Sequence, residues 1–147
     1  MEGHPFGAGE VTVDVANIPD EADILRLQHD AIDSFGGEHG VLKEGCVDGT
    51  LNGAITSAMY HGDDDDVDLL YLASFLLHKF AKNKHCFVDG NKRIGWIAAI
   101  DVLNRHHLTI EAGNEEAARM VEQVVDDSSC DVDWIATWLG KRLTALE

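Results

Sequence analysis

The feature that most constrains the fold of this chain is the stretch IGWIAAIDVLN, residues 94–104, which is apolar around nearly its whole circumference. Its one charged residue is Asp101. A helix that is hydrophobic on every face is stable in water only when other elements surround it. The stretch therefore predicts a central helix, and the rest of the chain has to supply the elements that cover it.

Amphipathic segments on both sides of this stretch are suited to cover it. Apolar residues recur at helical spacing in five further segments, and we expect helices near residues 20–35, 48–59, 68–84, 114–125 and 131–143. The expected N-caps are Asp20, Asp48, Asn114 and either Asp131 or Asp133. Short strands are expected near residues 11–15 and 108–111. The sequence thus predicts an all-α fold, a bundle of about six helices with a short flap or hairpin.

The chain length fits one domain. We expect an N-terminal arm, residues 1–19, followed by a single helical domain, residues 20–147. Trp134 and Trp138, four positions apart on the last helix, are predicted to pack in its core.

The charge balance limits the possible partners. Lys and Arg number 11 against 27 Asp and Glu, which gives a net charge of −16. Such a surface repels phosphate backbones, so direct nucleic-acid binding is not expected. No apolar run approaches the length of about 20 residues that a membrane span needs, and no secretion signal opens the chain. We therefore expect a cytoplasmic protein that does not contact membranes.

Three cysteines stand far apart in the sequence, at Cys46, Cys86 and Cys130. Their number is odd and their spacing contains no CxxC pair, so the pattern predicts neither a zinc site nor a disulfide framework. The default expectation is a reducing compartment.

The nonapeptide HCFVDGNKR, residues 85–93, gathers two cations directly before the central helix. A helix N-terminus offers unpaired backbone N–H groups and the positive end of the macrodipole, which together favour a bound anion. Gly90 permits close approach of the backbone, and Asn91 can hold either the loop or a phosphate oxygen. Lys92 and Arg93 add a point charge and a bidentate fork. This half of the motif predicts a phosphate cradle.

The other half of the motif contains the groups that a catalysed transfer reaction would need. Asp89 supplies a hard oxygen ligand for Mg²⁺. His85, as a neutral imidazole, can accept the proton of an attacking hydroxyl, and Phe87 is expected to turn inward and anchor the loop. The pattern favours transfer of a phosphorus-centred group from a nucleotide to a hydroxyl. A loop that only caps the buried helix is the alternative, and the residues alone do not decide between the two.

The nonapeptide resembles the signature of the Fic/Doc superfamily, HxFx(D/E)GN(G/K)R, and its NKR ending is that of the Doc (death on curing) toxin branch. The stretch LRLQHDAIDSFGGEHGVLKEGCVDGTLNGAI resembles the amino-terminal half of Doc proteins, and the likeness covers roughly residues 20–145. It implies the small helical Fic fold. It also implies that His85 is the catalytic base, that Asp89 binds the metal, and that residues 90–93 hold the anion.

Two positions indicate which group is transferred. Enzymes of the superfamily that attach AMP usually have Gly at the position of Lys92 and a second arginine at that of Trp96. Gly90, in contrast, is a residue that this chain has in common with those AMP-transferring enzymes. Doc proteins share the lysine, lack the second arginine and transfer the γ-phosphate of ATP to a threonine of elongation factor Tu. The resemblance therefore implies a protein kinase that uses ATP and Mg²⁺. A Fic-type AMP transferase and a non-catalytic interaction module remain as alternatives.

The resemblance also implies a partner. Doc is neutralised by the antitoxin Phd, while other Fic proteins carry an inhibitory (S/T)xxxE(G/N) helix in the same chain. The nearest match here, Ser34 to Glu38, is followed by His39 in place of Gly or Asn. A separate Phd-like antitoxin is therefore expected. The stretch YHGDDDDVD, residues 60–68, corresponds to a target-docking flap, whose acids would favour a basic target segment.

Three other histidines are poor candidates for metal ligands. His106 and His107 are adjacent, so on a helix their side chains diverge by about 100° and form a poor metal pair. His78 lies outside the motif and is expected to be a packed or surface residue.

Overall fold

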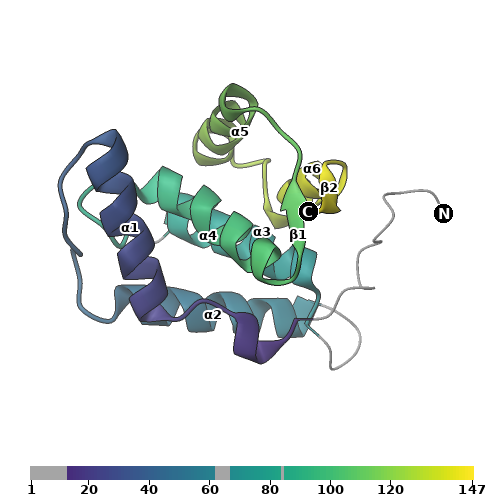
Figure 1. The fold of residues 1–147 in the computed structure, drawn as a ribbon, viewed down its shortest axis with the longest axis horizontal. Coiled ribbons are helices and arrows are strands. Elements are labelled where there is room, and N and C mark those ends of the chain that lie inside the picture. Colours follow the sequence, from purple (N-terminus) through teal and green to yellow (C-terminus); the bar gives the residue numbers. More distant parts are fainter. Residues whose placement is uncertain (1–12, 62–66, 84) are drawn as a thin grey trace.

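The computed structural model describes residues 13–61, 67–83 and 85–147. Helices dominate these residues, as the sequence predicts (Figure 1). Six α-helices follow in order, α1 (Glu21–Phe35), α2 (Cys46–His61), α3 (Leu69–His78), α4 (Asn91–Arg105), α5 (Asn114–Asp126) and α6 (Val132–Gly140). Two short helical turns, η1 (Val15–Asn17) and η2 (Lys79–Asn83), and two strands, β1 (Leu108–Ile110) and β2 (Leu143–Ala145), complete the described elements.

The predicted central helix is α4. It crosses the middle of the molecule, with α2 along one side and α5 on the opposite side (Figure 1). Its inward residues are fully buried, namely Ile94, Ala98, Ala99, Val102 and Leu103. A stripe along α3 and the turn that follows it is buried too, namely Leu69, Leu72, Ala73, Leu76 and Phe80. These two apolar segments form the core on which the other helices pack.

The close contact between α3 and α4 depends on Gly95. A Cβ at this position would lie 2.8 Å from the Cβ of Ala81 and 2.9 Å from the carbonyl oxygen of Leu77. Both distances are shorter than van der Waals contact, so any side chain would push the two helices apart. Gly95 therefore sets the position of α4 and of the loop that precedes it.

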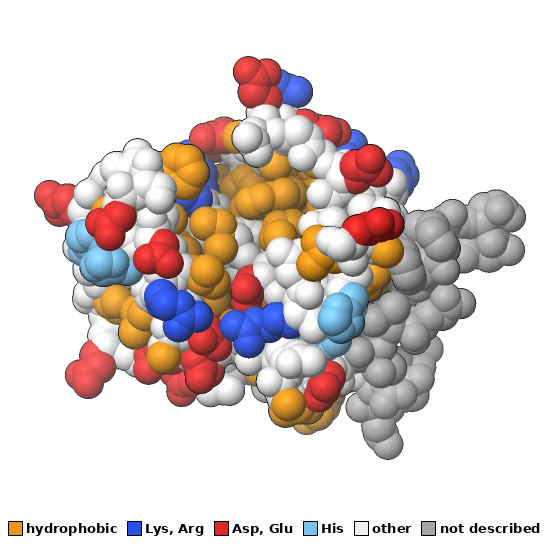
Figure 2. Space-filling model, in the orientation of Figure 1, with side chains coloured by type: hydrophobic (Ala, Val, Ile, Leu, Met, Phe, Trp, Pro, Cys, Tyr) orange, Lys and Arg blue, Asp and Glu red, His pale blue; other side chains and the backbone are white. Residues whose placement is uncertain are grey.

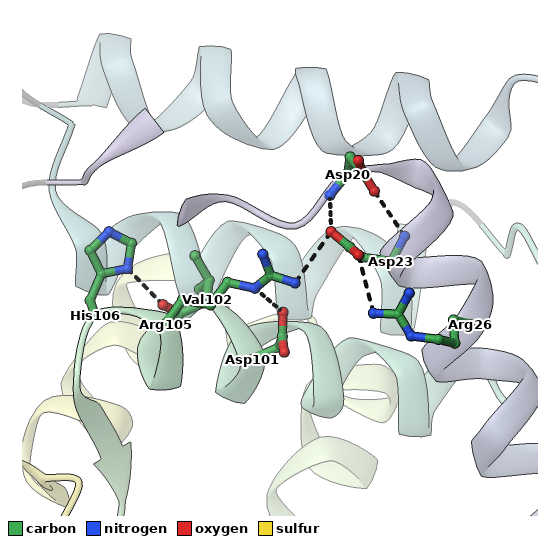
Figure 3. Close-up of polar contacts among 7 residues, drawn as sticks. All are labelled: Asp20, Asp23, Arg26, Asp101, Val102, Arg105 and His106. Carbon is green, nitrogen blue, oxygen red and sulfur yellow. Dashed lines mark hydrogen bonds and ion pairs between the residues drawn. The ribbon is translucent and has the colours of Figure 1, made fainter. Parts of the chain in front are cut away.

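The C-terminal end of α4 is tied to the start of α1 by charged side chains (Figure 3). Arg105 bonds Asp101 at 2.7 Å and Asp23 at 3.2 Å. Asp23 also completes a capping box with Asp20 and pairs with Arg26 at 3.1 Å. The backbone N–H of Asp20, together with the Arg26 and Arg105 guanidinium groups, lowers the pKa of Asp23. The carboxylate is therefore favoured in the folded state.

His106, at the end of α4, has a structural role. Its Nε2 accepts the backbone N–H of Asp14 at 2.9 Å, and its Nδ1 lies 2.8 Å from the carbonyl oxygen of Val102. Because Asp14 N–H can only donate, the proton of the neutral ring resides on Nδ1. The described part of the predicted arm is thereby held against the domain, where the backbone of Val13 also bonds that of Val67 at 3.2 Å.

Two predicted helix starts were wrong. The helix α2 begins at Cys46, two residues before Asp48, because its first hydrogen bond runs from Gly49 N–H to Gly45 O at 2.9 Å. The helix α5 is capped by Gly113, whose carbonyl accepts from Ala117, so that Asn114 is its first residue rather than its cap. At α6, Asp131 accepts the N–H of Trp134 and is the cap.

Two large hydrophobic residues of these helices, Met59 and Phe35, are exposed. The buried stripe of α2 runs through Leu51, Ala54 and Ala58, and Met59 lies at its edge. Phe35 is the last residue of α1. The two predicted core tryptophans of α6 do pack against the core, each partly buried.

The strand prediction was half right. The strand β1 forms as expected, but it pairs antiparallel with β2, with Thr109 opposite Thr144. The other strand, predicted near residues 11–15, does not form at residues 13–15, because Val15 is already the first residue of the turn η1, which Asp14 caps through the N–H of Ala16. Residues 11 and 12, and residues 62–66 of the predicted flap, lie outside the described residues. Among the helices that are described, none has the length and apolar character that crossing a membrane requires.

Candidate active site

The motif loop, which we define as residues 85–90, connects η2 to α4. The expected continuous helix ends at His78, and the chain continues as a π-helical turn through Lys79–Asn83. A π-helical turn is wider than an α-helical turn, and such turns are frequent at functional sites. His85 follows with a φ of 49°, in the left-handed region that a non-glycine residue rarely adopts. The loop therefore begins with an abrupt change in chain direction.

The His85 side chain is exposed and oriented by the turn before it. Its Nε2 lies 2.9 Å from the carbonyl oxygen of Lys82. A carbonyl can only accept, so this contact places a proton on Nε2. In the neutral ring Nδ1 then keeps its lone pair, and the structure presents it as the nitrogen that can take up a proton.

Phe87 and Asn91 fix the loop from within. Phe87 is completely buried, as predicted, and its ring lies 6.4 Å from that of Phe80. The Asn91 side chain accepts the backbone N–H of Phe87 at 3.0 Å and donates to its carbonyl at 2.9 Å. Of the two roles expected for Asn91, the structure shows that of holding the loop.

Gly90 is the N-cap of α4 and adopts the left-handed conformation, with a φ of 86°. Its carbonyl accepts the first helical hydrogen bond, from Ile94 at 2.8 Å. The N–H groups of residues 91–93 precede that bond and have no partner within the helix. They point outward from the positive end of the helix dipole. The geometry expected of an anion cradle is therefore present.

Asp89 is held by two segments of the chain. Its Oδ2 accepts the backbone N–H of Glu38 at 2.9 Å, and its carbonyl lies 3.3 Å from the amide nitrogen of the buried Gln28. Within the part of the chain that the structure describes, Oδ1 has no hydrogen-bond partner. Because the carboxylate is exposed and one oxygen is left to coordinate, Asp89 fits a hard divalent cation such as Mg²⁺.

Lys92 and Arg93 lie at the rim of the site, each in contact with a neighbour. The Lys92 ammonium pairs with Glu122 of α5 at 2.7 Å. The Arg93 guanidinium lies over the ring of Phe35, 4.8 Å from its centre. An anion at the α4 N-terminus would therefore compete with Glu122 for Lys92. Neither Phe35 nor Glu122 was singled out from the sequence, because nothing in the spacing of α1 or α5 indicates contact with the motif.

Two adjacent cavities surround these side chains. One of about 400 Å³ lies over the motif loop and is lined by residues that include His85, Asp89, Asn91 and both cations. The other, of about 490 Å³, lies between α4 and α5 and shares Lys92 and Arg93 with the first. Hydrophobic side chains gather in the hollow below α5 (Figure 2). Trp96 lines this second cavity and packs edge-on against Trp138, with their ring centres 6.2 Å apart.

The prediction for the cysteines was wrong. Cys46 and Cys86 form a disulfide across 40 residues, with Cα atoms 5.5 Å apart. The fold brings them together because the segment before α2 pairs with the motif loop, where Leu42 N–H donates to Cys86 O at 2.8 Å. The spacing of the cysteines in the sequence does not indicate this contact. Cys130 is a free thiol, and burial raises its pKa.

His78 lies outside the motif loop. It is partly buried, and its Nδ1 contacts the side-chain amide of Asn83 at 3.2 Å. Burial, followed by the charges of Lys82 and Lys79, lowers its pKa. His78 therefore packs beside η2 as a neutral residue, as expected.

These observations define a class of helical protein in which an exposed histidine and a carboxylate stand beside an anion-binding helix N-terminus. Comparison with known proteins specifies the class. The sequence matches the Fic/DOC family over residues 18–103, from the end of η1 to late in α4. It is also 35% identical over 108 residues to Toxin Doc of Mycolicibacterium smegmatis, a match that covers 73% of this chain and 81% of that protein. The chain belongs to the Fic/DOC family, on its Doc branch.

Proposed function

We propose that this protein is a Doc-like toxin of a toxin–antitoxin system. In the proposed activity it acts in the bacterial cytoplasm as a protein kinase, transferring the γ-phosphate of ATP to a Thr or Ser hydroxyl of a translation factor such as elongation factor Tu. The observation that carries the proposal is the placement of His85 and Asp89 beside the N-terminus of α4. The similarity to Toxin Doc supports the toxin part.

The site residues fit ATP and Mg²⁺. The Oδ1 atom of Asp89 is oriented by the bond that Oδ2 makes with Glu38, and would coordinate Mg²⁺. The backbone N–H groups of the first turn of α4, with Lys92 and Arg93, would hold the phosphates. When bound, Mg²⁺ would neutralise charge on the phosphate oxygens. The two adjoining cavities, about 400 and 490 Å³, leave room for a nucleotide.

His85 would serve as the general base. The oxygen of the target hydroxyl forms a bond to the γ-phosphorus while the bond from that phosphorus to the β–γ bridging oxygen breaks, and ADP leaves. The hydroxyl proton passes to Nδ1 of His85, the nitrogen that does not face Lys82. General-base catalysis of this kind contributes a factor of about 10²–10⁴ to the rate.

Trp96 favours phosphoryl over AMP transfer. It occupies the position at which AMP-transferring relatives have a second arginine, and its indole packs against Trp138. An indole has one donor and no charge, so it cannot replace a guanidinium on the phosphates. Lys92 agrees with the same assignment. AMP transfer remains the alternative outcome of the test below.

A Phd-like antitoxin is the proposed partner. The chain carries no complete inhibitory motif of its own, since His39 follows Glu38 where Gly or Asn is required. An antitoxin segment that folds on binding would suit this arrangement, because it can be removed by proteolysis or competition.

The proposal is tested by incubating the protein with a bacterial lysate, Mg²⁺ and ATP labelled at either the γ or the α phosphate. We expect label from the γ position alone, on a band of the size of elongation factor Tu. His85→Ala should abolish it, whereas His107→Ala, in the exposed turn after α4, should not. Label from the α position would instead establish an AMP transferase.

A second measurement distinguishes an enzyme from a binding module. ATP with Mg²⁺ should raise the Tm of both the wild type and His85→Ala, because the base is not needed for binding. Asp89→Asn should lose the dependence on Mg²⁺. A nucleotide-induced shift without transfer under any condition would favour the non-catalytic module.

A further inference from the structure

Two histidines and one aspartate form a cluster where α1 meets the loop whose Glu38 N–H binds Asp89. His29 and Asp33 are one turn apart on α1, and His39 lies in the loop that follows. The His29 Nδ1 is 3.3 Å from one Asp33 oxygen, and the His39 Nε2 is 2.9 Å from the other. One ligand atom from each residue can be chosen so that all lie within 4.8 Å of one another. The three side chains converge on one point.

Glycines bring His39 back to α1. The helix ends at Phe35, and Gly36 and Gly37 follow with φ values of 97° and 115°. Only glycine adopts such values readily, so the pair allows the chain to reverse direction. The reversal stacks the His39 ring on that of His29, with centres 4.1 Å apart.

The chemistry of the cluster suits a first-row transition metal. Imidazole nitrogens with one carboxylate are a ligand set of zinc sites, whereas Mg²⁺ and Ca²⁺ prefer oxygen ligands alone. Two stacked imidazolium rings would repel each other, but both rings are neutral when they bind a metal. All three side chains are between 44% and 62% exposed, so a cation can reach them from solvent. Among the described residues, no other group of three such side chains converges in this way.

The cluster is coupled to the active site through the loop that carries His39. On one side of it, Glu38 N–H binds Asp89 Oδ2 at 2.9 Å. On the other side, Gly40 O accepts the N–H of Val88 at 3.1 Å. Fixing His39 to α1 would therefore fix the two backbone groups that hold the motif loop.

We propose that His29, Asp33 and His39 bind one Zn²⁺-class divalent ion, which clamps residues 36–42 against the motif loop. Water completes the coordination. The ion is structural and distinct from the Mg²⁺ that accompanies ATP at Asp89. Its occupancy controls how firmly Asp89 is positioned.

Metal binding is measured directly, with untagged protein stripped of metal and dialysed against ZnCl₂. No thiol reductant is present, so that the Cys46–Cys86 disulfide stays closed. We expect one Zn²⁺ per chain by elemental analysis. A chromophoric chelator should show an affinity at least tenfold lower for His39→Ala and Asp33→Asn, because even outer-shell changes cost about 10–100-fold. The matched controls, Asp30→Asn on α1 and His61→Ala on α2, should bind as the wild type does.

Hydrogen exchange tests the clamp. Zn²⁺ should slow amide exchange in residues 36–42 of the wild type and of the two controls, but not of His39→Ala. The zinc site is overturned if no Zn²⁺ binds or if His39→Ala binds it with unchanged affinity. The clamp is overturned if Zn²⁺ binds and loop exchange stays the same. Neither readout uses ATP or a target protein, so the result is independent of whether the proposed kinase activity holds.

Discussion

The two ends of α4 use charged and polar groups in opposite ways. At the C-terminal end, Arg105 is enclosed by Asp23 and Asp101, and both ring nitrogens of His106 are bonded to backbone. At the N-terminal end, His85 and Asp89 are exposed, and each leaves one polar atom available. At one end Arg105 and His106 are bonded within the protein, whereas at the other end His85 and Asp89 keep an atom available for a ligand.

This difference shows what a buried helix contributes to a small protein. Contacts along its length, above all at Gly95, and the ion pairs of Arg105 at its far end hold α4 against its neighbours. The motif loop can then adopt a conformation that is locally unfavourable, with His85 at a positive φ. Stability and chemistry are therefore separable on this helix, and substitutions at its two ends should affect different measurements.

The largest effect is expected at the N-terminal end. His85→Ala should lower the rate of phosphoryl transfer by about 10²–10⁴, because the base is removed. The Tm should stay close to that of the wild type, since the side chain is exposed and makes one hydrogen bond, to Lys82. Initial rates with labelled ATP, paired with a thermal melt, provide the measurement. A large drop in Tm would mean that His85 supports the fold, and would remove the contrast between the two ends.

Breaking the Cys46–Cys86 disulfide should destabilise the motif loop and leave the packing of α4 unchanged. The double variant Cys46→Ser and Cys86→Ser should lose about 2–4 kcal/mol in the free energy of unfolding, because the unfolded chain regains the freedom of a 40-residue loop. Urea denaturation measures this. Adding a reductant should destabilise the wild type by a similar amount and leave the double variant unchanged. Equal sensitivity of both proteins to reductant would contradict the disulfide.

Adding a methyl group at the contact between α3 and α4 should destabilise the folded protein. Gly95→Ala forces a methyl group against Ala81 and should cost about 1–3 kcal/mol. Gly49→Ala is the matched control, since a Cβ there meets nothing within 4 Å and alanine favours a helix by up to about 1 kcal/mol. Chemical denaturation of both variants checks the prediction. A neutral Gly95→Ala would show that the helices are not in close contact.

The smallest effect is expected at the C-terminal end of α4. Asp23→Asn should lower stability near neutral pH by up to about 1 kcal/mol and leave transfer activity intact. The backbone N–H of Asp20 and the neighbouring guanidinium groups lower the pKa of Asp23, so its contribution is present above the unfolded-state value of about 3.9. It is lost as the pH falls through the lower, folded-state value. The wild type and variant should therefore converge in Tm in acid, and a constant difference would contradict the ion-pair explanation.

Much of the fold could be predicted because its signals are local. The apolar circumference of residues 94–104, the glycines after Phe35 and the carboxylate caps of α1 and α6 are each visible within one or two helical turns. The start of α2 was misplaced because a backbone carbonyl of Gly45, rather than a side-chain cap, accepts its first hydrogen bond.

The site was predicted only as far as its motif extends. HCFVDGNKR identifies the residues that face the cavity, but not the groups that orient them. Glu38, Gln28, Glu122 and Phe35 reach the motif from other elements, as does Cys46 through its disulfide. Such contacts depend on tertiary packing and leave no periodic pattern in the sequence.

The central claim is that the N-terminal end of α4, with His85 as base, transfers a single phosphate to a protein hydroxyl. The most direct measurement is mass spectrometry of purified elongation factor Tu after incubation with this protein, ATP and Mg²⁺. We predict one added phosphate on a threonine or serine with the wild type and with Asp23→Asn, at initial rates that are about 10²–10⁴ lower with His85→Ala. An AMP adduct on the target, or phosphate that His85→Ala adds at the wild-type rate, would contradict the account.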